Sequence, residues 1–298
     1  MTNLTKLLTP QAIAVIGASK DRSKIGNSIL RNIIDAGYRG RIIPVHPTER
    51  SVEGKKAYPS VMNVAKTIDF AVIAVPAGIV PDVLTECGKK KIPFVVIISA
   101  GFAEAGTVGK RLDARIRNIA GKFHIRILGP NCLGIINTAH RLNASFASGY
   151  PLEGNVSFIS QSGAMLVSLV DWSLRQGIGL GKLISLGNAS GIKDFEVLDA
   201  LARDTETAAI GMYIEEVSEP RKLLETLQRY SKKKPIIILK AGASDAGIEA
   251  IASHTGSLAG SHEVISAAFH QAGAIQVHDL EELFNILVLY ASPARHPS

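Results

Sequence analysis

A histidine near the end of the chain lies in a short run of small and polar residues. His254 follows Ser253 and precedes Thr255-Gly256-Ser257, and an apolar helical pattern comes after this run. Imidazole titrates near neutral pH, and when one ring nitrogen is held by a hydrogen bond the other can attack a phosphoryl group. We therefore consider His254 a candidate phosphoryl carrier. The alternative is an ordinary solvated loop histidine.

Two further motifs contain residues that suit phosphoryl chemistry. Ser160-Gln161-Ser162-Gly163 ends an apolar run and opens an apolar helical pattern, and a helix N-terminus binds anions through its free N–H groups. Glu215 directly follows the apolar run 209–214. We predict that Ser160, Gln161, Ser162 and Gly163 receive the phosphoryl group and that Glu215 holds one imidazole nitrogen of His254. A plain surface carboxylate is the alternative for Glu215.

The elements that position these residues alternate between strand-like and helical patterns along the whole chain. The strand-like runs are almost continuously apolar, which is typical of parallel sheets covered by helices on both faces. The sequence predicts an α/β protein with two tandem doubly wound domains, residues 1–143 and 144–298, joined through an extended connection at 137–153. Strands are expected at 13–16, 41–45, 70–75, 94–99, 125–128, 156–160, 183–186, 209–214, 236–239 and 275–277. Helices are expected near 23–36, 80–90, 109–121, 165–176, 194–203, 221–230, 258–271 and 280–289.

Ligands of such sheets bind outside the carboxyl ends of the strands, so the loops that follow strands are the candidate sites. In the first domain these loops are rich in small residues, which let a phosphate approach the backbone. The candidates are Gly17, Ala18, Ser19, Lys24, Val45, Val75, Pro76, Ser99, Ala100, Gly101, Phe102, Asn131 and Cys132. Five such loops at one edge favour a ligand-binding groove.

Several other classes of site lack their required motifs. A dinucleotide site needs G-x-G-x-x-G and an acid at the end of strand two, but that strand ends Val45-His46-Pro47 with Glu49 further on. A nicotinamide-dependent oxidoreductase thus has only fold analogy in its favour. No Gly-Lys pair is followed by Ser or Thr, which excludes a P-loop.

Composition limits the remaining possibilities. The chain has 298 residues, 46% of them hydrophobic, and a net charge of +7 that favours anionic partners. With only Cys87 and Cys132, no disulfide framework or cysteine zinc site is available, and we predict no metal site. Aromatic residues are 5% and no nucleic-acid-binding motif is found. We expect a cytoplasmic protein that binds neither nucleic acid nor membrane.

Six motifs in this order resemble one known family. They are Ile16-Gly17-Ala18-Ser19 with Lys24 and Gly26, Ala74-Val75-Pro76-Ala77, Ser99-Ala100-Gly101-Phe102, Gly129-Pro130-Asn131-Cys132, Ser160-Gln161-Ser162-Gly163 and Ser253-His254-Thr255-Gly256. The likeness is to the α subunit of the nucleoside-diphosphate-forming acyl-CoA synthetases, which include succinate–CoA ligase and ADP-forming acetate–CoA ligase. It covers essentially the whole chain. The resemblance implies a Rossmann-like CoA-binding domain followed by a flavodoxin-like ligase domain.

The resemblance also implies a reaction and its participants. CoA would lie along the first-domain loops, with Asn131 and Cys132 near the thioester, and His254 would be phosphorylated beside Glu215. The enzyme would interconvert acyl-CoA, ADP and phosphate with a small carboxylic acid, CoA and ATP through an acyl phosphate. ATP or ADP with Mg²⁺ would bind an ATP-grasp β subunit or fused domain, in a hetero-oligomer. A CoA-binding regulatory module without turnover is the alternative.

This chain departs from the family at two positions. His46 stands where the family often has Asn, and Glu216 where the acetate branch often has Gly. The acyl substrate and the nucleotide preference stay open.

Overall fold

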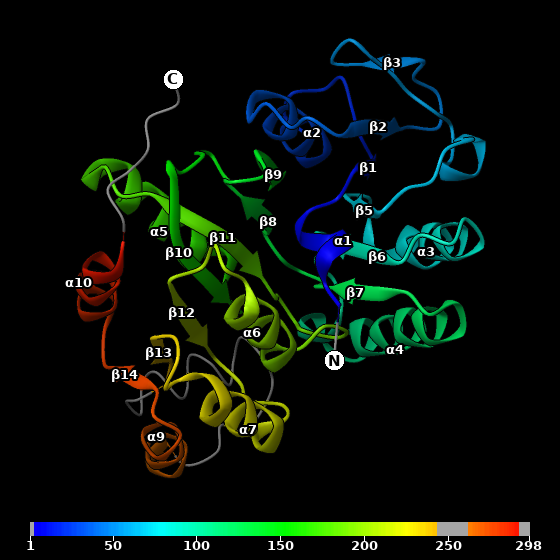
Figure 1. The fold of residues 1–298 in the computed structure, drawn as a ribbon. Helices are drawn as coiled ribbons and strands as arrows, with labels where there is room; N and C mark the ends of the chain where they lie inside the picture. Colours follow the sequence, from blue (N-terminus) through cyan, green and yellow to red (C-terminus); the bar gives the residue numbers. More distant parts are fainter. Residues whose placement is uncertain (1–2, 243–261, 292–298) are drawn as a thin grey trace. The chain divides into compact units, whose positions relative to one another are not determined.

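The computed structural model describes residues 3–242 and 262–291, and the chain divides into two compact units (Figure 1). We call them the N-terminal unit, Asn3–Tyr150 with Ser185–Ile192, and the C-terminal unit, Pro151–Ile184 with Lys193–Ser298. Thus one segment that follows a strand of the second unit, Ser185–Ile192, packs with the first.

The N-terminal unit contains a parallel sheet in the order β2-β1-β5-β6-β7. Its strands are β1 (Ala12–Ile16), β2 (Arg41–Val45), β5 (Phe70–Ile73), β6 (Phe94–Ile97) and β7 (Arg126–Leu128). Its longer helices are α2 (Ile25–Asp35), α3 (Val80–Lys89) and α4 (Gly106–Phe123). Smaller elements are α1 (Thr5–Leu8), the ribbon β3 (Ser51–Val52) and β4 (Lys55–Lys56), and the 3-10 turns η1 (Val61–Asn63), η2 (Ala77–Ile79) and η3 (Ala103–Ala105).

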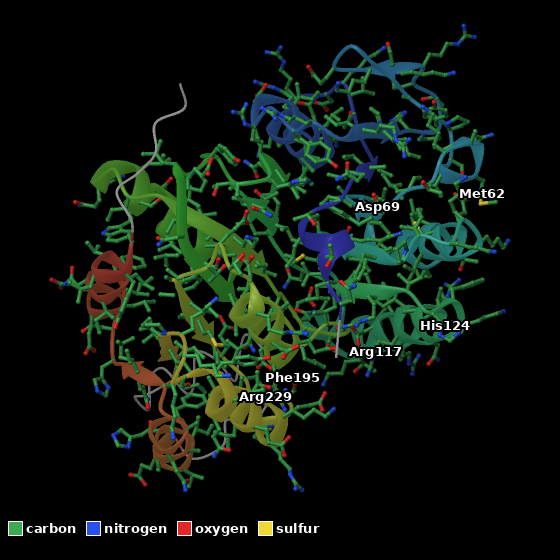
Figure 2. All side chains as sticks on the ribbon, in the orientation of Figure 1. Met62, Asp69, Arg117, His124, Phe195 and Arg229 are labelled. Atoms are coloured by element: carbon green, nitrogen blue, oxygen red, sulfur yellow. The ribbon has the colours of Figure 1, made fainter. Side chains whose placement is uncertain are left out.

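The three central strands β1, β5 and β6 are apolar and buried at every position, which indicates that both faces of the sheet are covered there. In β1, Ala12, Ala14 and Ile16 join a cluster with residues of α3 and α4, and the alternate residues point to the opposite face. The start of β1 is fixed by Asp69, whose Oδ2 accepts the main-chain N–H groups of Gln11 at 2.8 Å and Ala12 at 3.1 Å (Figure 2). The loops at the carboxyl ends of these strands therefore follow a largely buried sheet.

The C-terminal unit contains strands in the order β14-β13-β12-β10-β11. These are β10 (Glu153–Ser160), β11 (Leu180–Ser185), β12 (Ala209–Ile214), β13 (Ile236–Lys240) and β14 (Ile275–Val277). The described helices are α5 (Gly163–Gln176), α6 (Asp194–Arg203), α7 (Pro220–Tyr230), α9 (His262–Gln271) and α10 (Leu280–Tyr290). Pairing of β12 with β10 and β13, and of β13 with β14, is parallel.

The two units share one strand order when β1, β2, β5, β6 and β7 of the first, and β10 to β14 of the second, are numbered along the chain. In each, the first strand lies between the second and the third, which is the flavodoxin-type order 2-1-3-4-5. Connections leave the first and third strands in opposite directions, so a crevice forms between their carboxyl ends. The candidate sites are thus expected beside β1 and β5 in one unit and beside β10 and β12 in the other.

The predicted α/β architecture with two doubly wound sheets is confirmed, but one segment was predicted wrongly. Residues 137–153 were expected to be an extended connection, whereas β8 (Gly134–Asn137) and β9 (Leu142–Ser145) form an antiparallel hairpin in the N-terminal unit. Its polar residues are buried and hydrogen-bonded: Asn137 donates to Leu8 O at 2.8 Å. Within the described residues, no helix combines the length and the apolar character that a membrane crossing needs.

Candidate functional site

A cleft of about 650 Å³ lies at the crevice of the N-terminal unit, beside the carboxyl ends of β1 and β5. Seven of the residues predicted from the sequence line it together: Gly17, Ser19, Lys24, Val75, Pro76, Ser99 and Ala100. The lining also contains Ser23, Ile25, Gly26, His46, Pro47, Ala74, Ala77 and Ile98. Its volume suits a nucleotide-sized ligand.

Two glycines let the backbone segments of this cleft approach each other. Gly17 has φ +91°, and a Cβ there would lie 2.3 Å from Ala74 O, at the end of β5. A Cβ on Gly26 would lie only 1.9 Å from Gly17 O. The first turn of α2 therefore rests directly on the turn after β1, which places the helix N-terminus against the cleft.

The start of α2 offers donors for an anion. Lys24 is the N-cap residue, and among the described residues its side chain makes no capping hydrogen bond. The main-chain N–H groups of the first turn and the exposed Lys24 ammonium therefore line the same cleft. This arrangement fits a phosphate-bearing ligand.

The end of β2 carries an imidazole instead of an acid. His46 Nδ1 accepts the main-chain N–H groups of Glu49 at 3.1 Å and Thr48 at 3.4 Å, so a neutral ring carries its proton on Nε2. Glu49 pairs with Lys20 at 2.6 Å, and the hydrogen bond from Lys20 lowers the Glu49 pKa. A nicotinamide site would have an acidic side chain here to accept hydrogen bonds from the ribose hydroxyls. This cleft has the imidazole of His46 in its place, with an N–H group that can donate.

The remaining predicted residues of this unit lie at the ends of the same sheet's strands but do not line the cleft. Ala18, Val45 and Phe102 are buried. Cys132 is also buried, its Sγ donates to Ile97 O at 3.3 Å, and burial raises the pKa of its thiol to about 12. Cys132 therefore stays a neutral thiol near pH 7 and is not a nucleophile.

Gly101 and Asn131 belong to a hydrogen-bond network that sequence reasoning did not assign. Glu104 accepts the N–H groups of Gly101 at 2.6 Å and Phe102 at 3.2 Å, and it also accepts a short hydrogen bond from Asn188. Asn131 Nδ2 donates to Asn188 Oδ1 at 3.3 Å. Burial raises the Glu104 pKa, but these hydrogen bonds outweigh it and hold the pKa below its usual value. The network fixes the loops after β6 and β7.

In the C-terminal unit, the predicted phosphate-binding motif forms the start of α5. Ser162 is its N-cap and accepts the Met165 N–H at 3.3 Å, while Ser160 Oγ accepts the Ser162 N–H at 3.0 Å and donates to Ser162 O at 2.7 Å. Hydrogen bonds between Ser160 and Ser162 fix the turn that leads into α5, and Gly163 is the first residue of this helix. The N-terminus of α5 therefore opens at the carboxyl edge of the sheet, as an anion site requires.

Gln161 contacts the main chain of Glu215 and Glu216 at this edge, a contact that the sequence did not predict. Gln161 Oε1 accepts the N–H groups of both Glu215 and Glu216 at 2.8 Å, and its Nε2 donates to Glu216 O at 2.8 Å. The side-chain amide of Gln161 thus binds the end of β12. The half-buried Glu215 carboxylate contributes to a raised pKa of Tyr213, whose main cause is burial.

Lys240, at the end of β13, also contacts this strand end and was not predicted from the sequence. Its Nζ donates to Glu215 O at 2.9 Å and to Ala241 O at 2.7 Å, and its side chain is buried. Burial lowers the Lys240 pKa, and the nearby Glu215 and Glu216 charges oppose that shift. The sequence feature that could have indicated this residue is a lysine directly after the apolar run 236–239, at the end of a predicted strand.

His254 lies outside the described residues, in the segment between β13 and α9. Its role as phosphoryl carrier and its pairing with Glu215 stay predictions. Within the described part of the chain, no cluster of His, Cys, Asp or Glu could hold a metal ion.

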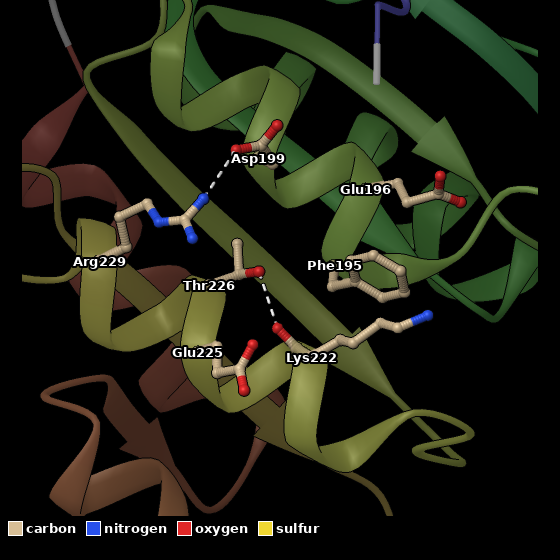
Figure 3. Close-up of a pocket in the computed structure, with 7 residues that line it drawn as sticks. All are labelled: Phe195, Glu196, Asp199, Lys222, Glu225, Thr226 and Arg229. Atoms are coloured by element: carbon tan, nitrogen blue, oxygen red, sulfur yellow. Dashed lines mark hydrogen bonds and ion pairs between the residues drawn. The ribbon is translucent and has the colours of Figure 1, made fainter. Parts of the chain in front are cut away.

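Another hollow, of about 260 Å³, lies between α6 and α7 (Figure 3). Its lining is rich in charged residues: Arg229 approaches Asp199 at 4.0 Å, and Glu225 pairs at 3.2 Å with Arg221, which lies outside the lining. The Lys222 ammonium lies 5.2 Å from the centre of the Phe195 ring. None of the sequence motifs contributes to this hollow. We therefore interpret it as a space between the side chains of two packed helices and not as a binding site.

Comparison with known proteins matches each unit to a described domain. Residues 11–138 match the model of a CoA binding domain, and residues 153–290 match a succinyl-CoA ligase like flavodoxin domain. Fold and site together define a CoA-binding domain joined to a ligase-type flavodoxin domain. The chain therefore contains these two domains in the predicted order, and over almost its whole length it is similar to α subunits of ADP-forming acetate–CoA ligases, the resemblance that its motifs predicted.

Individual relatives agree with this assignment. The chain is 44% identical over 287 residues to subunit alpha of acetate–CoA ligase [ADP-forming] I of Pyrococcus furiosus, covering 95% of this chain and 62% of that subunit. It is 41% identical to 4-hydroxybutyrate–CoA ligase [ADP-forming] of Nitrosopumilus maritimus, covering 96% and 41%. Acetyl-coenzyme A synthetase 1 of Candidatus Korarchaeum cryptofilum, solved with phosphate and ADP, superposes with a TM-score of 0.93 at 40% identity, covering 96% and 62%. The chain thus spans about two fifths to three fifths of the length of these relatives.

Proposed function

We propose that this chain is the CoA-binding and phosphohistidine-carrying part of an ADP-forming acyl-CoA ligase. One observation carries the proposal: Ser160–Gly163 and Glu215 flank the crevice of the C-terminal sheet, where β10 and β12 lie side by side. A helix N-terminus for a phosphoryl group and a carboxylate for an imidazole thus lie at one edge, and the chain continues from β13 toward His254.

The reaction would proceed in three reversible transfers. Phosphate attacks the acyl-CoA thioester carbonyl, the C–S bond breaks, and acyl phosphate and CoA form. The free imidazole nitrogen of His254 then attacks the acyl phosphate phosphorus, releasing the carboxylate. Finally the phosphoryl group passes from His254 to ADP and gives ATP.

The chain's own residues would bind and orient the participants. The cleft beside α2 would hold CoA, with the helix N-terminus and Lys24 facing its phosphates. Glu215 would fix the tautomer and orientation of His254, and the start of α5 would stabilise the transferred phosphoryl group. Buried, neutral Cys132 would take no covalent part.

The substrate and the partner follow from the relatives' names. Their acyl groups are acetate and 4-hydroxybutyrate, so we propose a small carboxylic acid as substrate. Because these relatives extend well beyond the matched part, we propose that ADP or ATP with Mg²⁺ binds an ATP-grasp β subunit or fused domain, in a hetero-oligomer.

ATP formation tests the proposed function. The chain is mixed with a candidate ATP-grasp subunit, acetyl-CoA, phosphate, ADP and Mg²⁺, and ATP and free CoA are measured together. We expect equal amounts of both products from the wild type, and no ATP from the His254→Asn variant. CoA binding by calorimetry without any turnover, whatever the partner, would identify a regulatory module instead.

A further inference from the structure

The main-chain groups of Glu215 lie beyond the last paired residue of β12. They are held by the side chain of Gln161, the residue after β10, and by that of Lys240, the last residue of β13. Sheet pairing brings Tyr213 beside Ser160 and Ile214 beside Lys240. One residue further on, the Glu215 N–H donates to Gln161 Oε1 at 2.8 Å, and the Glu215 carbonyl accepts from Lys240 Nζ at 2.9 Å. Both polar groups of this residue are therefore fixed from opposite sides.

We propose that Lys240 is a positioning residue for phosphoryl transfer, acting through the backbone of Glu215. This inference rests on the proposed function, in which Glu215 orients His254. Lys240 connects the end of β12 with the start of the segment that leads to His254, because its ammonium donates to both Glu215 O and Ala241 O. It thereby holds the Glu215 main chain, from which the carboxylate projects, against Ala241 at the end of β13.

Burial and charge support this role over that of a surface lysine. The Lys240 side chain is 5% exposed, and burying an ammonium is costly unless hydrogen bonds compensate. Two carbonyl oxygens accept from it, and the acidic side chains of Glu215 and Glu216 favour its charged form. A buried cation at this edge also suits a site where a phosphoryl group gathers negative charge.

The same strand offers a matched control. Lys234 precedes β13 at the opposite edge of the sheet, and its Nζ likewise donates to two main-chain carbonyls, Leu201 O at 3.1 Å and Asp204 O at 2.6 Å. Burial lowers the Lys234 pKa as it does that of Lys240. The two lysines differ in which end of the sheet they hold and in burial, since Lys240 is buried and Lys234 is half-buried.

The test compares Lys240→Met with Lys234→Met in the full chain with its partner subunit. Phosphorylation of His254 by acetyl-CoA and labelled phosphate is followed in single-turnover experiments, together with the CoA dissociation constant and the melting temperature. We expect Lys240→Met to slow labelling roughly 10- to 100-fold, the usual cost of misplacing a reacting group by about 1 Å, with CoA binding unchanged. Lys234→Met should label at the wild-type rate despite a similar loss of melting temperature.

Two further variants separate positioning from general stability. Lys240→Gln keeps N–H donors without the charge and should recover part of the rate; it also serves if Lys240→Met does not fold. In a Glu215→Gln background, Lys240→Met should cost little more, because both changes act on one group. The proposal is overturned if both lysine variants slow labelling equally, if Lys240→Met labels at the wild-type rate, or if the effects of Lys240→Met and Glu215→Gln simply add. If the wild-type protein is never labelled, the proposed function itself fails and this inference falls with it.

Discussion

The start of α2 lies so close to the turn after β1 that adding one methyl group, in Gly26→Ala, should weaken CoA binding. In Gly26→Ala the new Cβ would lie 1.9 Å from Gly17 O, whereas real Cβ atoms essentially never come within 3.0 Å of such an atom. Because the obstacle is backbone, the start of α2 must move away by at least about 1.1 Å. The N–H groups and Lys24 that face the cleft move with it.

The displacement should weaken both the fold and the binding of CoA. Overpacking costs about 1–3 kcal/mol of stability, and an error of about 1 Å in a binding group can cost up to about 100-fold. We expect the CoA dissociation constant of Gly26→Ala, measured by calorimetry on the full chain, to rise at least about 10-fold, equivalent to about 1.4 kcal/mol. Circular dichroism would verify that the variant is folded.

Gly78→Ala provides the control beside the same cleft. Gly78 adjoins Ala77, which lines the cleft, but a Cβ there would meet nothing within 4 Å. Its CoA affinity should equal that of the wild type. If Gly26→Ala binds CoA as tightly as Gly78→Ala, the cleft is not the CoA site or the close approach does not matter for binding.

Three other substitutions test separate parts of the account. Cys132→Ala should keep its turnover number while losing stability, since the buried thiol with a pKa of about 12 is neutral; loss of turnover in folded protein would contradict this. Burial raises the pKa of Asp194 to about 6 from 3.8, so the folded protein binds this proton more tightly than the unfolded chain. The free energy of unfolding should therefore fall as the pH rises from about 4 to 6. Asp194→Asn should flatten that part of the stability profile in urea titrations, and an unchanged slope would refute the shift. Gly121→Ala, with open space at a helical site in α4, should add about 0.5–1 kcal/mol to the free energy of unfolding; a lower melting temperature would argue against the helix there.

The sequence predicted the elements best where local pattern and tertiary burial agree. The helix α6 and the strands β12 and β14 have the predicted bounds, because their apolar periods end at charged or turn residues. The β8–β9 hairpin was missed because Asn137 and Asn143, both polar, are buried within it. In the same way β11 begins before its predicted start, since Lys182 is buried and pairs with Asp204 at 2.8 Å.

The sequence predicted where the candidate cleft lies, but not which side chains contact one another around the candidate sites. Strand-end loops with small residues identified the cleft, since parallel strands bring their carboxyl ends to one edge. The backbone contacts of Gln161 and Lys240, and the position of Asn188 between Glu104 and Asn131, depend on which strands become neighbours. Strand order is a tertiary property that local spacing does not encode.

Detection of phosphate on His254 tests the central claim most directly. The full chain with its partner subunit is mixed with acetyl-CoA and phosphate without ADP, and the modified residue is identified by mass spectrometry under conditions that preserve phosphohistidine. We predict an acid-labile phosphate on His254 that disappears when ADP is added with the release of ATP, and that is strongly reduced in Glu215→Gln. Phosphate on another residue, or equal labelling of His254→Asn, would contradict the account.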